Sequence, residues 1–165
     1  MRVLVYGNAG SGKSTYAAAL ARQHDMPHLD LDTVFWEREK IAVRRAPADV
    51  RADLEAFVDE HSRWVIEGCY GELVEFVMAD CTELVFLNPG EAACLANCRA
   101  RPWEPHKYAS KTAQDRMLPA LLDWVRDYYH RDSEASLREH RRLFAAFDGP
   151  KRELAHLPSL SVDAR

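Results

Sequence analysis

The first part of the sequence that could carry chemistry is a glycine-rich stretch near the amino terminus. Residues 7–14 match the pattern Gly-x-x-x-x-Gly-Lys-[Ser/Thr] in full. Glycines in such a loop let successive backbone N–H groups turn toward a phosphate, and a following helix adds its N-terminal dipole. Lys13 can then reach the β- and γ-phosphates of a nucleoside triphosphate, while the Ser14 hydroxyl can bind Mg²⁺. The predicted nucleotide contacts are Gly7, Asn8, Ala9, Gly10, Ser11, Gly12, Lys13, Ser14 and Thr15.

Three acidic residues follow two short apolar segments that we expect to be strands. Asp30 and Asp32 occur in Leu29–Asp32, and Glu67 follows Trp64–Ile66. Ligands of open α/β sheets bind at the carboxyl ends of the strands, so we expect these carboxylates to converge. They could hold Mg²⁺, in part through water, or accept a proton from an attacking hydroxyl. A role in a turn or as a helix N-cap is the alternative for Asp30.

Basic residues gather around a segment that has neither helical nor strand periodicity. This segment, residues 102–110, contains two prolines, and the basic residues in and around it are Arg99, Arg101, His106, Lys107 and Lys111. A mobile loop with guanidinium groups can screen the charge of a transferring phosphoryl group and exclude water. We therefore predict a lid-type segment at about residues 100–115, with a solvated helix end as the alternative for Arg101.

A second group of residues could contact the molecule that receives a phosphoryl group. Arg44 and Arg45 lie between the second expected strand and its helix, where they could bind an anionic group. Phe35 and Trp36 could form a wall of the same pocket or belong to the core. Gly68 has no side chain and would let a substrate approach the backbone closely.

The elements that must position these residues alternate along the chain. Apolar runs predict strands at residues 2–6, 27–31, 64–66, 84–87 and 152–157, and helical periodicity predicts helices at 13–24, 47–62, 91–100, 118–129 and 133–147. Ser133 is the expected N-cap of the last helix, and Pro119 is expected in the first turn of the preceding helix or at a kink. This alternation predicts an α/β fold of three layers with a central parallel sheet of about five strands.

The composition narrows the classes of protein that remain. The 165 residues fit a single domain spanning 1–165, since domains cluster at about 100–150 residues. A net charge of −4 and the lack of a helix-turn-helix pattern or basic stripe argue against a nucleic-acid partner. The sequence shows no apolar core of a signal peptide and no membrane-spanning apolar run. Four cysteines without a secretory signal predict a cytoplasmic protein. We expect a monomer or a homodimer.

Taken together, these motifs resemble those of shikimate kinases. The resemblance rests on the phosphate loop, Asp30-x-Asp32, the glycines after the third strand and the Arg101-Pro102 pair. The chain is also similar to small P-loop proteins termed adenylate-kinase-related or DNA-topology-modulation proteins. That likeness lies in the blocks Leu31–Trp36, Trp64–Gly68 and Leu84–Pro89.

The resemblance covers roughly residues 1–103 and implies the P-loop NTPase fold of nucleoside-monophosphate kinases. It implies that Asp32 contacts the acceptor hydroxyl, that Asp30 and Ser14 serve the metal, and that Arg101 is a lid arginine. One departure is that shikimate kinases have three consecutive glycines where this chain has Gly68-Cys69-Tyr70-Gly71. We therefore carry over the reaction class and leave the substrate open.

The prediction is a Mg-ATP-dependent phosphotransferase, a kinase that acts on an alcohol or phosphate group of a small metabolite. The alternative is a nucleotide-binding regulatory protein or slow NTPase, with a link to DNA topology. The predicted catalytic residues are Lys13, Asp32 and Arg101; the metal ligands are Ser14, Asp30 and Glu67; and the substrate contacts are Asp32, Arg45 and Gly68.

Overall fold

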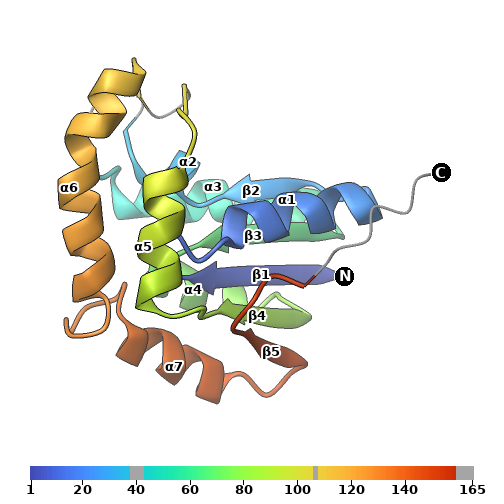
Figure 1. Cartoon of the computed structure of the whole chain (residues 1–165). Helices are drawn as coiled ribbons and strands as arrows, with labels where there is room; N and C mark the ends of the chain where they lie inside the picture. The colour runs from blue at the N-terminus through green and yellow to red at the C-terminus, as the bar shows by residue number, and fades with distance from the viewer. Residues whose placement is uncertain (38–42, 106–107, 159–165) are drawn as a thin grey trace.

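A computed structural model describes residues 1–37, 43–105 and 108–158 of the chain, and its strands form one parallel sheet (Figure 1). Every pair of neighbouring strands is parallel, and the strand order is β2-β3-β1-β4-β5. The strands are β1 (Arg2–Gly7), β2 (His28–Asp30), β3 (Trp64–Gly68), β4 (Glu83–Leu87) and β5 (Lys151–Leu154). The five-stranded parallel sheet confirms the predicted α/β fold.

Helices cover both faces of this sheet. The helices of the described residues are α1 (Lys13–His24), α2 (Asp32–Phe35), α3 (Pro47–Glu60), α4 (Gly71–Met78), α5 (Glu91–Ala100), α6 (Lys111–Asp127) and α7 (Leu137–Ala146). Side chains of a strand alternate between its two faces. In β1, Val3 and Val5 therefore pack with α1, whereas Leu4 and Tyr6 pack with α3, α4 and α7. The result is the predicted three-layer arrangement.

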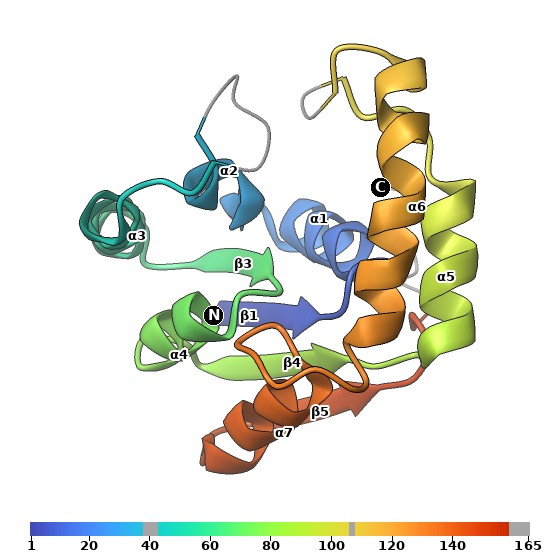
Figure 2. The same ribbon diagram turned by 90° about the vertical axis from the view of Figure 1, so that its left-hand side faces the viewer.

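The pair α5 and α6 has a special place in the fold. Both views show these two helices beyond the carboxyl ends of the strands rather than over the middle of a face (Figures 1 and 2). A separate small apolar cluster of Cys94, Leu95, Cys98 and Val125 holds the pair together. The carboxyl edge of the sheet is therefore flanked by helices whose loop is the predicted lid-type segment.

The structure corrects several predicted boundaries. Helix α4 was not predicted. Helix α6 begins at Lys111 instead of Leu118, so that Pro119 lies in its interior and the first of the two expected placements is wrong. Pro119 is exposed there, and solvent can bond the carbonyl that loses its helical partner. Helix α7 is capped by Ser136 rather than Ser133, because the Ser136 side chain accepts a hydrogen bond from the Glu139 N–H.

None of the helices within the described residues combines the length and the apolar character that crossing a membrane requires.

Candidate active site

The glycine-rich loop lies between the end of β1 and the start of α1. Gly10 and Gly12 have φ angles of 77° and 92°, in the region that favours glycine over residues with a side chain. Lys13 is the first residue of α1, and the Tyr16 N–H bonds the Gly12 carbonyl at 3.0 Å. The strand–loop–helix order that the pattern needs is therefore present, and nucleotide contact by residues 7–15 stays a prediction.

Side chains from α5 and the loop itself hold this loop in place. The Asn97 Nδ2 donates to the Gly10 carbonyl oxygen at 2.8 Å, and the Asn8 Nδ2 donates to the Val125 carbonyl oxygen at 3.0 Å. A Cβ atom on Gly10 would lie only 2.3 Å from the carbonyl oxygen of Cys94. The loop therefore depends on close packing against the α5/α6 pair.

Glu67 ends up buried at the centre of the carboxyl edge. It lies in β3, in register with Asp30 of β2 on one side and Val5 of β1 on the other, and so on the sheet face that α1 covers. Its residue exposure is 1%, and neither carboxylate oxygen has a hydrogen-bond partner in the described part of the chain. Burial raises the pKa of Glu67 to about 7, although Lys13 opposes the shift.

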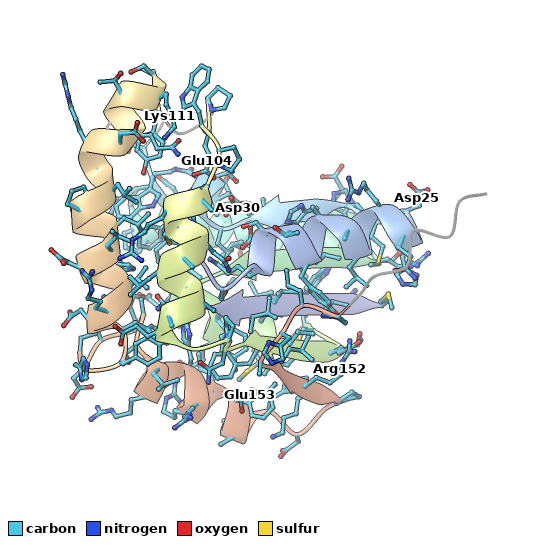
Figure 3. All side chains as sticks on the ribbon, in the orientation of Figure 1. Asp25, Asp30, Glu104, Lys111, Arg152 and Glu153 are labelled. Atoms are coloured by element: carbon cyan, nitrogen blue, oxygen red, sulfur yellow. The ribbon has the colours of Figure 1, made fainter. Side chains whose placement is uncertain are left out.

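Lys13 faces this group of carboxylates. Burial by itself lowers the pKa of the Lys13 ammonium, but Glu67 acts in the opposite direction. Asp32 and Asp30 also raise it, and the net result is a raised pKa. The structure thus brings together one cation from the loop, the carboxylates of Asp30 and Glu67 from two strands, and that of Asp32, which the structure places at the start of α2 instead of at a strand end. Figure 3 shows Asp30 at the end of β2.

The site fits a magnesium ion by its donor set. Ser14 lies near enough to Glu67 to oppose the rise in the pKa of that carboxyl, so a hydroxyl and a carboxylate occur side by side. Among the residues that the structure describes, no three His, Cys, Asp or Glu side chains are arranged to hold a metal alone. Mg²⁺ usually takes one or two carboxylates and completes its shell with phosphate oxygens and water, so Ser14 and Glu67 suffice.

Asp32 is held by Tyr70, which the sequence analysis noted only as a departure from the three glycines of shikimate kinases. The Tyr70 hydroxyl donates a hydrogen bond to the Asp32 Oδ1. The Tyr70 oxygen in turn accepts a hydrogen bond from the Trp36 Nε1 at 2.8 Å. The Asp32 backbone N–H bonds the Asp30 Oδ1 at 2.9 Å, so Asp30 has the turn role that was the alternative to metal binding. The same carboxylate can still bind a metal through its other oxygen.

The predicted acceptor contact Arg45 has partners within the protein. Its Nη1 donates to the Val34 carbonyl oxygen at 2.9 Å and to the Asp53 Oδ2 at 2.7 Å. It borders a cavity of about 220 Å³ lined by Phe35, Arg44, Arg45, Pro47, Val50, Arg51, Glu72 and Leu73. The other two arginines are also paired, Arg44 with Glu134 and Arg51 with Glu72.

Gly68 is surrounded by protein atoms. A Cβ atom at this position would lie 2.7 Å from the Leu31 Cδ1. The packing of Leu31 therefore accounts for the missing side chain, and a substrate contact at Gly68 stays a prediction.

Arg101 lies at the carboxyl end of α5 and forms an ion pair with Glu104 at 3.2 Å. The Glu104 N–H bonds the Gln114 Oε1 at 2.8 Å, so the segment is attached to the first turn of α6. Glu104 lies beyond the end of α5 (Figure 3). His106 and Lys107 lie outside the described residues.

His140 is a buried polar residue that the sequence analysis missed. It is fully buried, and its ring nitrogens contact the Tyr128 hydroxyl at 2.8 Å and the Cys69 carbonyl oxygen at 3.0 Å. Burial lowers the pKa of His140 to about 4, so the ring is neutral near pH 7. The Nε2–H then donates to Cys69, and the Nδ1 accepts from Tyr128. No spacing in the sequence signals this contact.

The fold is shared with solved structures. TT1252 from Thermus thermophilus matches with a TM-score of 0.57 at 17% identity, over 97% of this chain and 90% of that chain. A sugar kinase from Janibacter sp. HTCC2649 matches with a TM-score of 0.52 at 14% identity, over 93% and 83%. A shikimate kinase from Aquifex aeolicus has a TM-score of 0.49 at 20% identity, over 96% and 89%.

The two larger TM-scores establish a shared α/β fold with a five-stranded parallel sheet, one that a small-molecule kinase also has. No protein-family model and no curated protein matches the sequence. At these identities the likeness shows the fold alone, so the reaction must be argued from the site.

Proposed function

We propose that the chain is a phosphotransferase that moves the γ-phosphoryl group of Mg-ATP to a small metabolite. The observation that carries this proposal is that Lys13 of the phosphate loop shares one site with Asp30, Asp32 and Glu67. Nucleotide binding uses the loop N–H groups, the lysine and a metal ion, whereas transfer to an acceptor hydroxyl also needs a group that takes its proton.

Each loop residue has a defined task in this proposal. Backbone N–H groups within residues 7–15 would bind the phosphates, although those of Ala9 and Ser11 bond Asn8 in the structure. Lys13 would neutralise charge on the β- and γ-phosphates. Ser14, Glu67 and Asp30 would hold Mg²⁺, directly or through water. When bound, the ion supplies positive charge that stabilises the charge developing on the transferring group.

Asp32 is the proposed proton acceptor. The acceptor oxygen forms a bond to the γ-phosphorus while the bond between that phosphorus and the β–γ bridging oxygen breaks, and ADP leaves with the electron pair. The proton of the acceptor hydroxyl passes to the Asp32 carboxylate. If the acceptor were a phosphate group that is already ionised, Asp32 would orient it through water without taking a proton.

Arg101 and Arg45 complete the proposal. Arg101 would leave its ion pair with Glu104 and bind the transferring phosphoryl group instead. The planar guanidinium of arginine is suited to binding two phosphate oxygens at once. Arg45 would bind an anionic group of the acceptor beside the cavity that it lines. The backbone at Gly68 is the other proposed contact with the acceptor.

The direct test combines binding with turnover. Isothermal titration with Mg-ATP and, separately, with Mg-GTP should show which nucleotide binds, with one binding site per chain. The variant Lys13→Ala should lose nucleotide binding or turnover. Release of ADP is then followed with a panel of shikimate, sugars, nucleoside monophosphates and simple alcohols. Binding of Mg-ATP without turnover above the hydrolysis rate on any of these would favour the regulatory protein or slow NTPase instead.

A further inference from the structure

The hydrogen bonds from Trp36 through Tyr70 to Asp32 have only one possible direction. An indole Nε1–H can only donate, so the Tyr70 oxygen accepts the bond of 2.8 Å from Trp36. The hydroxyl hydrogen of Tyr70 is therefore left to point at the Asp32 Oδ1, as the structure shows. The chain ends on a carboxylate, which only accepts when ionised.

The ring of Tyr70 cannot easily move away from Asp32. Tyr70 is only 7% exposed, and its ring stacks on that of Phe35 with the centroids 3.8 Å apart. The Trp36 ring lies nearly perpendicular to that of Phe35, with the centroids 4.7 Å apart. The three aromatic rings thus hold the tyrosine oxygen at a fixed place beside α2.

The backbone on both sides of Tyr70 is held as well. Before it, the Cys69 carbonyl oxygen is bonded by the buried His140 at 3.0 Å. After it, the Gly71 N–H bonds the Glu134 carbonyl oxygen at 3.1 Å, and a Cβ on Gly71 would lie 2.3 Å from that oxygen. The segment that carries Tyr70 is therefore locked onto α7 and the turn that precedes it.

From this geometry we infer that Tyr70 is a positioning residue that holds the Asp32 carboxylate in the orientation needed to meet the acceptor hydroxyl. The inference rests on the proposed function, in which Asp32 takes the proton of the acceptor. Trp36 acts through Tyr70. Its N–H occupies the Tyr70 oxygen as a hydrogen-bond donor, so the Tyr70 hydroxyl hydrogen is directed to Asp32. Neither aromatic residue needs to touch the substrate for this role.

The variant Tyr70→Phe tests the inference, because phenylalanine keeps the stacked ring and removes only the hydroxyl. The matched control is Tyr6→Phe: Tyr6 is also buried, donates to the His140 carbonyl oxygen at 3.0 Å, and stacks on Phe86 at 5.0 Å. Both variants lose the hydroxyl hydrogen bond of a buried tyrosine, but only one of these bonds ends on Asp32.

For Tyr70→Phe we expect kcat to fall roughly 10- to 100-fold, the loss that one charge-assisted hydrogen bond can cause. The Kd of Mg-ATP should stay within about twofold, since the loop is untouched. Tyr6→Phe should leave kcat within about twofold, and Trp36→Phe should give an intermediate loss because the hydroxyl can then rotate. Equal kcat values for Tyr70→Phe and the wild type would overturn the inference.

A crystal structure of Tyr70→Phe separates this inference from the proposed function. We expect the Asp32 carboxylate to adopt a different side-chain rotamer once the hydroxyl is gone. If the wild type turns over none of the acceptors, the proposed function fails. The Asp32 rotamer in Tyr70→Phe then tests by itself whether Tyr70 positions Asp32. An Asp32 side chain that keeps its orientation in Tyr70→Phe would show that Tyr70 does not position it.

Discussion

Asn8 connects the glycine-rich loop to α6 through a single side chain. Its Nδ2 donates to the Val125 carbonyl oxygen at 3.0 Å, and its Oδ1 accepts from the Ala9 N–H at 2.8 Å. Asn8 is buried, so water cannot replace either bond. The conformation of the loop and the position of α6, which stands beyond the strand ends, therefore depend on the same amide group (Figure 2).

The substitution Asn8→Ala should destabilise the protein, because it leaves the buried Val125 carbonyl and the Ala9 N–H without partners. We expect a loss of about 1–3 kcal/mol in the free energy of unfolding, measured by urea denaturation. Asn88→Ala is the control, since the Asn88 side chain bonds Glu153 at the surface and should change stability by less than about 0.5 kcal/mol. Equal losses in both variants would contradict the bridging role of Asn8.

Lys13→Ala should remove the proposed contact with the β- and γ-phosphates. We expect the rate of phosphoryl transfer to fall by roughly 10³ or more, measured as ADP release. Arg22→Ala, at the other end of α1, removes an exposed positive charge from the same helix and should not change the rate. Normal turnover by Lys13→Ala would show that the loop is not the phosphate site.

Asp32→Asn should spare the affinity for Mg-ATP and abolish transfer, because the amide keeps the shape of the side chain but cannot take a proton. Titration calorimetry and the turnover assay measure the two effects separately. A variant that loses Mg-ATP binding instead would place Asp32 on the metal.

Arg101→Ala should affect activity far more than stability. Its ion pair with Glu104 is partly exposed and contributes at most about 1 kcal/mol to folding. A lid arginine that stabilises charge on the transferring group can contribute roughly 10³-fold in kcat. The control Arg126→Ala breaks the comparable pair with Asp123 on α6. If the two variants had a similar kcat, Arg101 would have no role in transfer and would be only a solvated residue at the end of α5.

His140 should make the stability of the protein depend on pH. Burial lowers the pKa of His140 to about 4 from the ordinary value of 6.5, so the unfolded chain binds a proton more readily than the folded one. Stability from the neutral ring is present above pH 6.5 and is lost as the pH falls toward about 4. By about pH 5 the loss should reach about 2 kcal/mol.

Urea denaturation at several pH values measures this effect. The variant His140→Gln should be less stable near neutral pH but show a flatter decline in acid, because it has no ring to protonate. His130→Gln, at an exposed position, should decline as the wild type does. A His140→Gln variant with the wild-type slope would mean that other groups cause the acid sensitivity.

The features that the sequence determined by itself are local ones. The bounds of α1 and α5 were predicted to the residue, and the loop around Gly10 and Gly12 lies between a strand and a helix as its pattern requires. Such features depend on neighbours in the chain: helical hydrogen bonds, glycine conformations and the alternation of side chains along a strand. The same alternation and the parallel strand order carry Asp30 and Glu67 to one edge.

Only the tertiary structure decided which distant groups meet at that edge. Tyr70 and Asp32 are linked although they belong to different segments, Asn8 bonds Val125 across the fold, and Arg45 is held by Asp53. Helix α4 shares an apolar cluster with α7, a contact that exists only in the folded layers. The Ser136 cap is by contrast local, because its partner Glu139 is three residues further along the chain. A hydrogen bond between residues far apart in the chain leaves no periodic signal, because its geometry exists only after the layers have packed.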